Sequence, residues 1–186
     1  LGAENVLGIL MPSPYSSDHS ISDALELAQN LGIQTQTLAI GTLMECYDQT
    51  LDSLFAGTPF GLAEENLQSR IRGTLLMAVS NKFGHLLVST GNKSEMAVGY
   101  CTLYGDMNGG LAAIADVPKT KVYRICEWLN ESKLIIPVNV ITKAPSAELK
   151  PGQKDQDSLP DYDVLDDILD RYIHRHESLA EIIEAG

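Results

Sequence analysis

Residues 86–95, LLVSTGNKSE, carry the strongest chemical signal in the chain. An apolar run ends in hydroxyl side chains, turns at Gly91 and leads into a predicted helix. The free N–H groups of a helix start, together with the Thr90 hydroxyl, can hold a phosphate or a ribose. The same residues also form an ordinary helix start, because Asn92 and Glu95 have the spacing of a capping box. The pattern alone leaves both interpretations open.

Two other segments could contact an anion. Asn66, Arg70 and Gly73 are spaced i, i+4 and i+7, which places them on one stripe of a long predicted helix. An Arg there could meet an anion and a Gly would let a ligand come close. A solvated Arg and a Gly without function explain the spacing equally well. Residues 143–149, KAPSAEL, form a polar loop after an apparent strand, and this loop alone is weak evidence for a site.

The cysteines and histidines show no arrangement for metal binding or nucleophilic catalysis. The three cysteines form no CxxC pair and have no histidine at ligand spacing, which argues against zinc and against a disulfide framework. We therefore expect free, mostly buried thiols, and no nucleophile–base pair that includes a histidine. The cysteines are Cys46, Cys101 and Cys126, and the histidines are His19, His85, His174 and His176.

The elements that must position these candidates alternate between strands and helices. Short apolar runs predict strands, and apolar residues at helical spacing predict helices. Strands are expected over residues 6–11, 35–40, 85–89 and 135–141, and helices over 21–31, 43–54, 62–83, 94–100, 118–129 and 164–173. This alternation predicts an α/β fold with a parallel sheet flanked by helices. Ligands bind such sheets at the carboxyl ends of the strands, where Thr90 and residues 143–149 would gather.

Two details of the predicted helices can be specified further. Gly32 follows the first helix and is expected to end it. The longest helix is expected to turn one apolar stripe toward the core. That stripe consists of Leu67, Ile71, Leu75, Ala78 and Val79.

Length, composition and charge indicate one compact cytoplasmic domain. The chain has 186 residues, of which 44% are apolar, and no apolar run approaches the ~20 residues of a membrane span. Its net charge of −12 argues against nucleic acid as a partner. Residues 1–69 contain nine acidic side chains and no Lys or Arg, so a phosphate site must draw its cations from Arg70 onwards.

Six blocks of sequence together resemble the synthetase domain of NAD synthetase. They are ENLQSRIR at 65–72, STGNKSE at 89–95, GYCTLYGD at 99–106, DVPKT at 116–120, PSAEL at 145–149 and QKDQDSLP at 153–160. The TGNKSE motif at residues 90–95 is similar to the corresponding motif of the glutamine-dependent branch of the family. The resemblance implies the adenine-nucleotide α-hydrolase-like, or ATP-pyrophosphatase, fold.

The resemblance also implies a reaction. ATP would adenylate the nicotinate carboxylate of deamido-NAD and release pyrophosphate, with Mg²⁺ neutralising the triphosphate. Ammonia, supplied from glutamine by a glutaminase domain, would then displace AMP and give NAD. The family further implies a homo-oligomer. No residue of this chain is assigned as catalytic.

The family's binding residues can be transferred only where this sequence matches its motifs. Thr90, Lys119 and Ser146 would contact ATP; Asn66, Glu95, Arg70 and Asp106 would contact deamido-NAD; and Glu95 would also contact the metal ion. Lys119 suits a phosphate because it is a point charge at a predicted helix start.

One family feature is absent from the chain. The Ser-Gly-Gly-x-Asp-Ser loop, which grips the pyrophosphate of ATP, is missing, and the only Gly-Gly pair is Gly109-Gly110. We therefore expect residues 1–186 to be a synthetase domain that is partial at both ends and cannot make NAD alone. Two alternatives stay open: a non-catalytic nucleotide-binding module of the same fold, and a related ligase or amidotransferase, against which the matched blocks argue.

Overall fold

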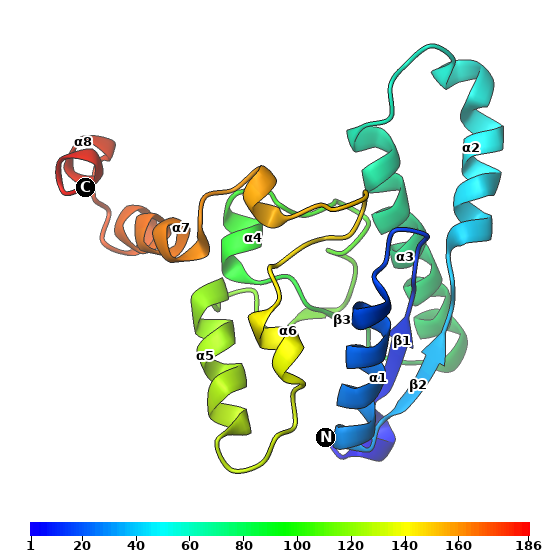
Figure 1. Ribbon diagram of the computed structural model, residues 1–186, viewed down its shortest axis with the longest axis horizontal. Helices are drawn as coiled ribbons and strands as arrows, with labels where there is room; N and C mark the ends of the chain where they lie inside the picture. Colours follow the sequence, from blue (N-terminus) through cyan, green and yellow to red (C-terminus); the bar gives the residue numbers. More distant parts are fainter.

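The computed structural model describes all residues, Leu1–Gly186, and its strands form two small parallel sheets (Figure 1). The strands are β1 (Leu7–Leu10), β2 (Gln34–Thr37), β3 (Val88–Ser89) and β4 (Leu111–Ala112). β1 pairs with β2 so that Leu7 lies opposite Gln34, and β3 pairs with β4 so that Val88 lies opposite Leu111. Parallel pairing across intervening helices confirms the predicted α/β class.

Helices surround these short strands and make up most of the chain. They are α1 (Asp18–Leu31), α2 (Gly41–Phe55), α3 (Leu62–Phe83), α4 (Lys93–Ala97), α5 (Lys119–Asn130), α6 (Val138–Thr142), α7 (Tyr162–Leu169) and α8 (Leu179–Glu184). Three single turns complete the list: the 3₁₀ turns η1 (Ala3–Asn5) and η2 (Asp155–Asp157) and the π turn η3 (Asp170–His174). In Figure 1, α2 and the start of α3 rise on one side, and α7 and α8 extend on the other.

The first β–α–β unit follows the sequence closely. Gly32 adopts a left-handed φ of 67° and ends α1, as predicted. The helix begins three residues earlier than expected, because the Ser17 hydroxyl accepts the Ser20 N–H at 3.2 Å and caps it. Beyond the end of β2, Ile40 still donates to the Pro12 carbonyl at 2.9 Å. The chain after β1 is thereby fixed at the carboxyl end of the sheet.

The prediction for α3 was correct in its bounds and wrong in its buried face. Of the expected apolar stripe only Ile71 is buried, and Ala78 is exposed. The other buried residues of this helix are Glu65, Gln68, Ser69 and Gly73. A buried polar face requires partners for its hydrogen bonds, and the loops around the cavity described below supply them. Apolar spacing could not reveal those partners.

The predicted strand over residues 135–141 is wrong. Pro137 has no N–H to donate to a sheet, and its φ of −54° starts the helix α6 instead. The two residues before it are bound by a side chain, since Asn130 Oδ1 accepts the N–H groups of Ile135 and Ile136, each at 2.9 Å. The sequence prediction also missed β4, which has two residues and follows Gly109 and Gly110.

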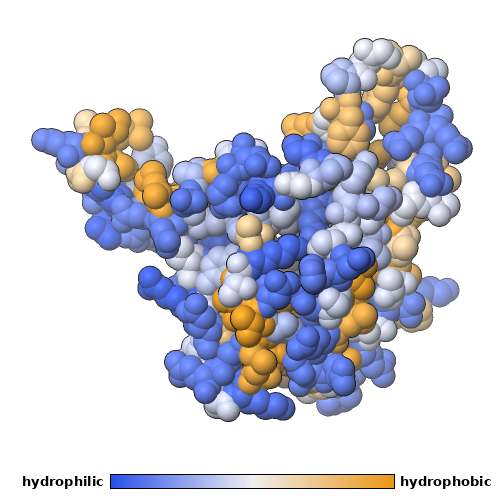
Figure 2. Space-filling model, viewed as in Figure 1, coloured by the Kyte–Doolittle hydropathy of each residue, from blue (hydrophilic) through white to orange (hydrophobic).

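Large apolar side chains remain exposed on the elements that project from the body of the molecule. Leu54 on α2 is 74% exposed and Ile183 on α8 is 78% exposed. Figure 2 shows apolar residues over both projecting regions. None of the helices combines the length and apolar character that crossing a membrane requires. All three cysteines are free, as predicted, but none is buried and Cys46 is exposed, so the expectation of mostly buried thiols is wrong.

Candidate nucleotide site

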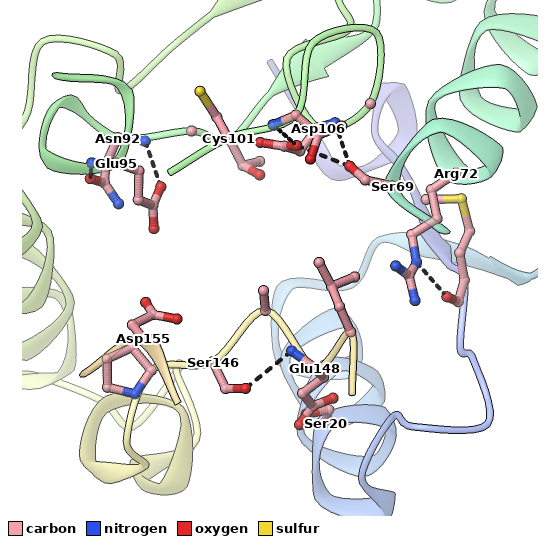
Figure 3. A pocket seen from close by; sticks show the side chains of 18 of the residues that line it. Ser20, Ser69, Arg72, Asn92, Glu95, Cys101, Asp106, Ser146, Glu148 and Asp155 are labelled. Atoms are coloured by element: carbon pink, nitrogen blue, oxygen red, sulfur yellow. Dashed lines mark hydrogen bonds between the residues drawn. The ribbon is translucent and has the colours of Figure 1, made fainter. Parts of the chain in front are cut away.

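A cavity of about 1010 Å³ lies at the carboxyl ends of β1 and β3. Its wall includes residues that follow both strands, the polar face of α3, the starts of α4 and α5, and the loop between α6 and η2. Figure 3 shows side chains from these separate segments directed at one open space. The cavity therefore stands where a parallel sheet is expected to bind its ligand.

The end of β3 leads into a capped helix and an ion pair. Asn92 Oδ1 accepts the Glu95 N–H at 3.0 Å, and Glu95 Oε2 accepts the Asn92 N–H at 3.0 Å, which confirms the capping box. The other Glu95 oxygen, Oε1, accepts from Lys119 Nζ at 3.0 Å. Both side chains of this pair are mostly shielded, with 18% and 20% exposure. The predicted ATP residue and the predicted metal residue are thus direct neighbours.

Ser94 and Asp166 fix the position of Lys119. Ser94 is fully buried and its hydroxyl accepts the backbone N–H of Lys119 at 2.8 Å. The same hydroxyl donates to Asp166 of α7, whose second oxygen accepts the Thr120 N–H at 2.9 Å. The carboxylate therefore binds the first turn of α5, where negative charge is favourable. These contacts join α4, α5 and α7 beside the cavity.

A second polar network lines another part of the cavity wall, on the same side of the open space as Glu95 in Figure 3. Asp106 Oδ1 accepts from the Ser69 hydroxyl at 3.0 Å and from the Thr102 N–H at 2.7 Å. The Thr102 hydroxyl in turn donates to Asn66 Oδ1 at 2.8 Å. Gly73 lets this loop approach α3, because a Cβ there would stand 2.8 Å from the carbonyl oxygens of residues 104 and 105. Asn66 and Asp106 are thereby held next to each other.

The third wall carries a cluster of charges around Glu148. Its carboxylate accepts from Lys143 Nζ at 2.6 Å, from the Ser17 hydroxyl at 2.9 Å and from the Ser20 hydroxyl at 2.8 Å. Burial opposes the charge of Glu148, but these hydrogen bonds outweigh burial and hold its pKa below the usual value. Burial lowers the pKa of Arg72, whose guanidinium Nε donates to the Met11 carbonyl at 3.0 Å.

The structure brings six of the seven predicted site residues to the cavity. The six are Asn66, Thr90, Glu95, Asp106, Lys119 and Ser146. Arg70 lies outside the cavity lining; it is exposed, and its Nε donates to the Leu103 carbonyl at 3.2 Å. The predicted stripe of α3 therefore splits, because Asn66 and Gly73 line the cavity and Arg70 does not.

The carboxylates around the cavity do not form a complete metal site by themselves. No group of three or more His, Cys, Asp or Glu side chains could hold a metal ion. Mg²⁺ is commonly held by one or two carboxylates together with substrate phosphates and water. Glu95 fits that limited role, although Lys119 occupies one of its oxygens and the Asn92 N–H the other.

Sequence reasoning missed several residues of the cavity wall. Arg72 and Ser69 lie inside a block that was matched, but spacing alone did not separate them from their neighbours. Glu148 stands in the loop after α6 and Asp155 opens the single turn η2, so neither carries a periodic signal, and Thr102 follows a Cys in an irregular segment. Only the folded chain brings these side chains together.

Known proteins with similar sequences and structures share one family. The family model described as NAD synthase matches residues 1–186. A glutamine-dependent NAD(+) synthetase from Synechocystis sp. is 74% identical over 186 residues, which are 100% of this chain and 33% of that protein. The chain thus spans about a third of the length of the curated relatives it matches.

Solved structures agree with this assignment. The glutamine-dependent NAD+ synthetase from Acinetobacter baumannii, solved in complex with ADP, has a TM-score of 0.74 and 46% identity, and the match covers 100% of this chain and 33% of that one. The NMN synthetase from Francisella tularensis has a TM-score of 0.79 and 28% identity, over 88% of this chain and 66% of that one. The chain has the adenine-nucleotide α-hydrolase type of fold and belongs to the NAD synthase family.

Proposed function

We propose that this chain forms the nucleotide site of an ATP-dependent ligase that converts deamido-NAD to NAD. The observation that carries the proposal is that the Glu95–Lys119 ion pair lines the same cavity as three other predicted site residues, Thr90, Asn66 and Asp106. Family membership and the ADP bound to the similar Acinetobacter synthetase support it. The same membership does not favour a non-catalytic module.

The reaction needs two bond changes at the nicotinate carboxylate. A carboxylate is a poor electrophile, because direct substitution by ammonia would expel an oxide. Attack of a carboxylate oxygen on the α-phosphorus of ATP breaks the bond to pyrophosphate and leaves an acyl-adenylate. Ammonia then adds at the acyl carbon, AMP leaves with the electron pair of the C–O bond, and a proton is lost from nitrogen. The chain's task is to align the two nucleotides and stabilise the phosphate charge.

The ATP contacts would come from three segments around the cavity. Thr90, at the end of β3, offers a hydroxyl beside the start of α4. Lys119 offers a positive charge whose backbone is fixed by Ser94. Ser146 lines the cavity from the loop after α6. A phosphate that displaced Glu95 from Lys119 would keep the positive charge of the Lys119 side chain neutralised.

Deamido-NAD would bind along the polar face of α3. The Asn66 amide keeps its N–H donors available, because only its oxygen is engaged by Thr102. Asp106 is anchored through one oxygen by Ser69 and Thr102, which leaves the other oxygen for a hydroxyl or amide of the ligand. Glu95 would contact the same substrate or hold Mg²⁺, which supplies positive charge where the triphosphate accumulates negative charge. Arg70 is assigned no direct contact.

Several properties of the complete enzyme are inferred from proteins with similar sequences. The ammonia would come from glutamine, since the relatives at up to 74% identity are glutamine-dependent synthetases. We further propose a cytoplasmic, homo-oligomeric protein. The pyrophosphate of ATP would need a Ser-Gly-Gly-x-Asp-Ser loop, which is not among these 186 residues.

The test is a chimaera in which this chain replaces the matching third of the Synechocystis synthetase. NAD formation is measured with ATP, deamido-NAD, Mg²⁺ and ammonium, and the mononucleotide analogue of deamido-NAD serves as a competing substrate. We expect deamido-NAD to be preferred and Glu95→Gln to lower the rate about 100-fold or more. The exposed Glu26→Gln on α1 is the matched control and should stay within about twofold of the parent. A folded chimaera that makes no NAD, or one that is indifferent to Glu95→Gln, would contradict the proposal.

A further inference from the structure

Asp155 is a buried carboxylate without a positively charged partner. Its side chain belongs to the turn η2 and the residue is 3% exposed. The Tyr162 hydroxyl donates to Oδ2 at 2.7 Å, whereas Oδ1 receives no hydrogen bond. None of the ion pairs in the structure includes this carboxylate. An unpaired buried charge and an unpaired buried acceptor are both costly, so a ligand at Oδ1 would be stabilising.

The carboxylate faces the same cavity as the Glu95–Lys119 pair. Figure 3 shows Asp155 across the open space from Asn92 and Glu95. Tyr100 and Tyr123 also line the cavity, and the charge of Asp155 acts on both phenols. The free acceptor is therefore reachable by a small ligand that enters the site.

The charges around Asp155 are predominantly negative. Burial first, and Asp155 next, raise the pKa of the Tyr100 phenol. The groups whose charges act on these phenols are Glu65, Glu95, Asp155, Asp157 and Lys119. Lys119 is bound to Glu95 at 3.0 Å and Lys150 to Glu65 at 3.1 Å, so Asp155 and Asp157 are the members of this group without a lysine partner. The local excess of negative charge selects a cation.

The chemistry of the surroundings narrows the kind of cation. A divalent metal ion is disfavoured, because no three His, Cys, Asp or Glu side chains converge to hold one. Aromatic rings favour an ammonium group, and Lys119 Nζ already lies 5.3 Å from the centroid of the Tyr162 ring. An ammonium ion combines a single charge with N–H donors that a partnerless carboxylate oxygen can accept.

We propose that Asp155 Oδ1 and the phenols of Tyr100 and Tyr123 form a binding subsite for the ammonium ion. The subsite rests on the proposed function, because that reaction consumes ammonia. It would hold the nitrogen source beside the Glu95–Lys119 pair until the nicotinate carboxyl is adenylated. The ion binds there without any nucleotide.

The test is a titration of the folded chain with ¹⁵NH₄⁺, followed by ¹⁵N line broadening and without nucleotides. We expect Asp155→Asn, which keeps an acceptor for Tyr162, to raise the Kd for ammonium about tenfold or more. The control Asp163→Asn removes the same charge from an exposed position of α7 and should leave the Kd unchanged within about twofold. Tyr162→Phe leaves both Asp155 oxygens free and should retain or tighten binding. Thermal unfolding of each variant establishes that it is folded.

Competing ions complete the experiment. Tetramethylammonium, which has no N–H donor and is larger, should not displace ¹⁵NH₄⁺, and K⁺ should displace it only weakly. Equal competition by K⁺, equal loss in Asp155→Asn and Tyr162→Phe, or undetectable binding to the folded parent chain overturns the proposal. Ammonium binding that depends on Asp155 in a chimaera unable to make NAD would instead contradict only the proposed function.

Discussion

Around the cavity polar side chains are buried, whereas on α2 and α8 large apolar side chains are exposed. Asn92 and Asp155 are each 3% exposed, while Leu54 and Ile183 are 74% and 78% exposed. Nine of the buried residues are polar or charged and six are hydrophobic, and six of the nine polar or charged residues line the cavity.

This contrast indicates where a substitution should cost the most stability. A buried polar group must keep its hydrogen-bond partners, and losing one costs about 1–3 kcal/mol. An exposed apolar side chain makes few contacts, and its removal changes the free energy of unfolding by about 0.5 kcal/mol or less. Substitutions around the cavity should therefore matter far more than substitutions on α2.

The largest effect is expected for Gly73→Ala. The new Cβ would stand 2.5 Å from Asn108 Nδ2 and 2.8 Å from each of two carbonyl oxygens, so the loop must move. We expect a loss of about 3 kcal/mol in the free energy of unfolding, measured by urea denaturation. Gly41→Ala at the start of α2 is the control, because its Cβ would stand 3.8 Å from Pro14. Equal stability of the two variants would show that the cavity wall is not tightly packed.

A smaller loss is expected for Lys119→Met. The variant keeps the aliphatic stem but leaves Glu95 without its partner at 3.0 Å in a mostly shielded position. We expect about 2 kcal/mol of destabilisation and weaker ATP binding by calorimetry. The exposed Lys82→Met at the end of α3 should change neither quantity by a comparable amount. Unchanged ATP binding in Lys119→Met would remove this residue from the proposed site.

The third prediction concerns pH and Glu148. Its pKa is lower in the folded chain than the usual 4.5, so its contribution to stability is complete above about pH 4.5 and is lost as the pH falls below that value, through the folded-state pKa. Glu148→Gln should lower stability by about 1 kcal/mol at pH 7 and reduce the loss of stability in acid. Thermal unfolding between pH 3 and pH 7 measures both effects. If Glu148→Gln lost as much stability in acid as the parent chain, the cluster around Glu148 would not be the cause of that loss.

The smallest effect is expected for Leu54→Ala on α2. This side chain is 74% exposed, so its truncation should cost about 0.5 kcal/mol or less. Ile71→Ala, at a position of α3 that is 4% exposed, provides the comparison and should cost about 2–4 kcal/mol by the same urea denaturation. Similar costs at the two positions would mean that the exposed and buried regions do not differ as described.

Short-range signals predicted the fold well where they were self-contained. Gly32 ends α1 and the Asn92–Glu95 capping box starts α4, because both depend on residues within one helical turn. The strand predicted over residues 135–141 failed because the branched residues there precede a proline that starts a helix. The predicted stripe of α3 failed because its buried face is polar.

The candidate site was predictable to the extent that its residues stand in local motifs. Thr90, Glu95 and Lys119 stand at strand ends or helix starts, and the structure brings them to the cavity. The contacts of Glu148 with Ser17 and Ser20 were not predictable, since these partners stand more than 100 positions away in the sequence, at the start of α1.

The sequence by itself determined the class of fold, the family and the approximate positions of most of the helices. These properties depend on local conformational preference and on motifs that are short enough to be recognised. The tertiary structure alone decided which face of α3 is buried, that Arg70 lies outside the cavity, and that one oxygen of Asp155 has no partner. Those outcomes depend on the position and direction of side chains that are distant in sequence, which neither composition nor spacing specifies.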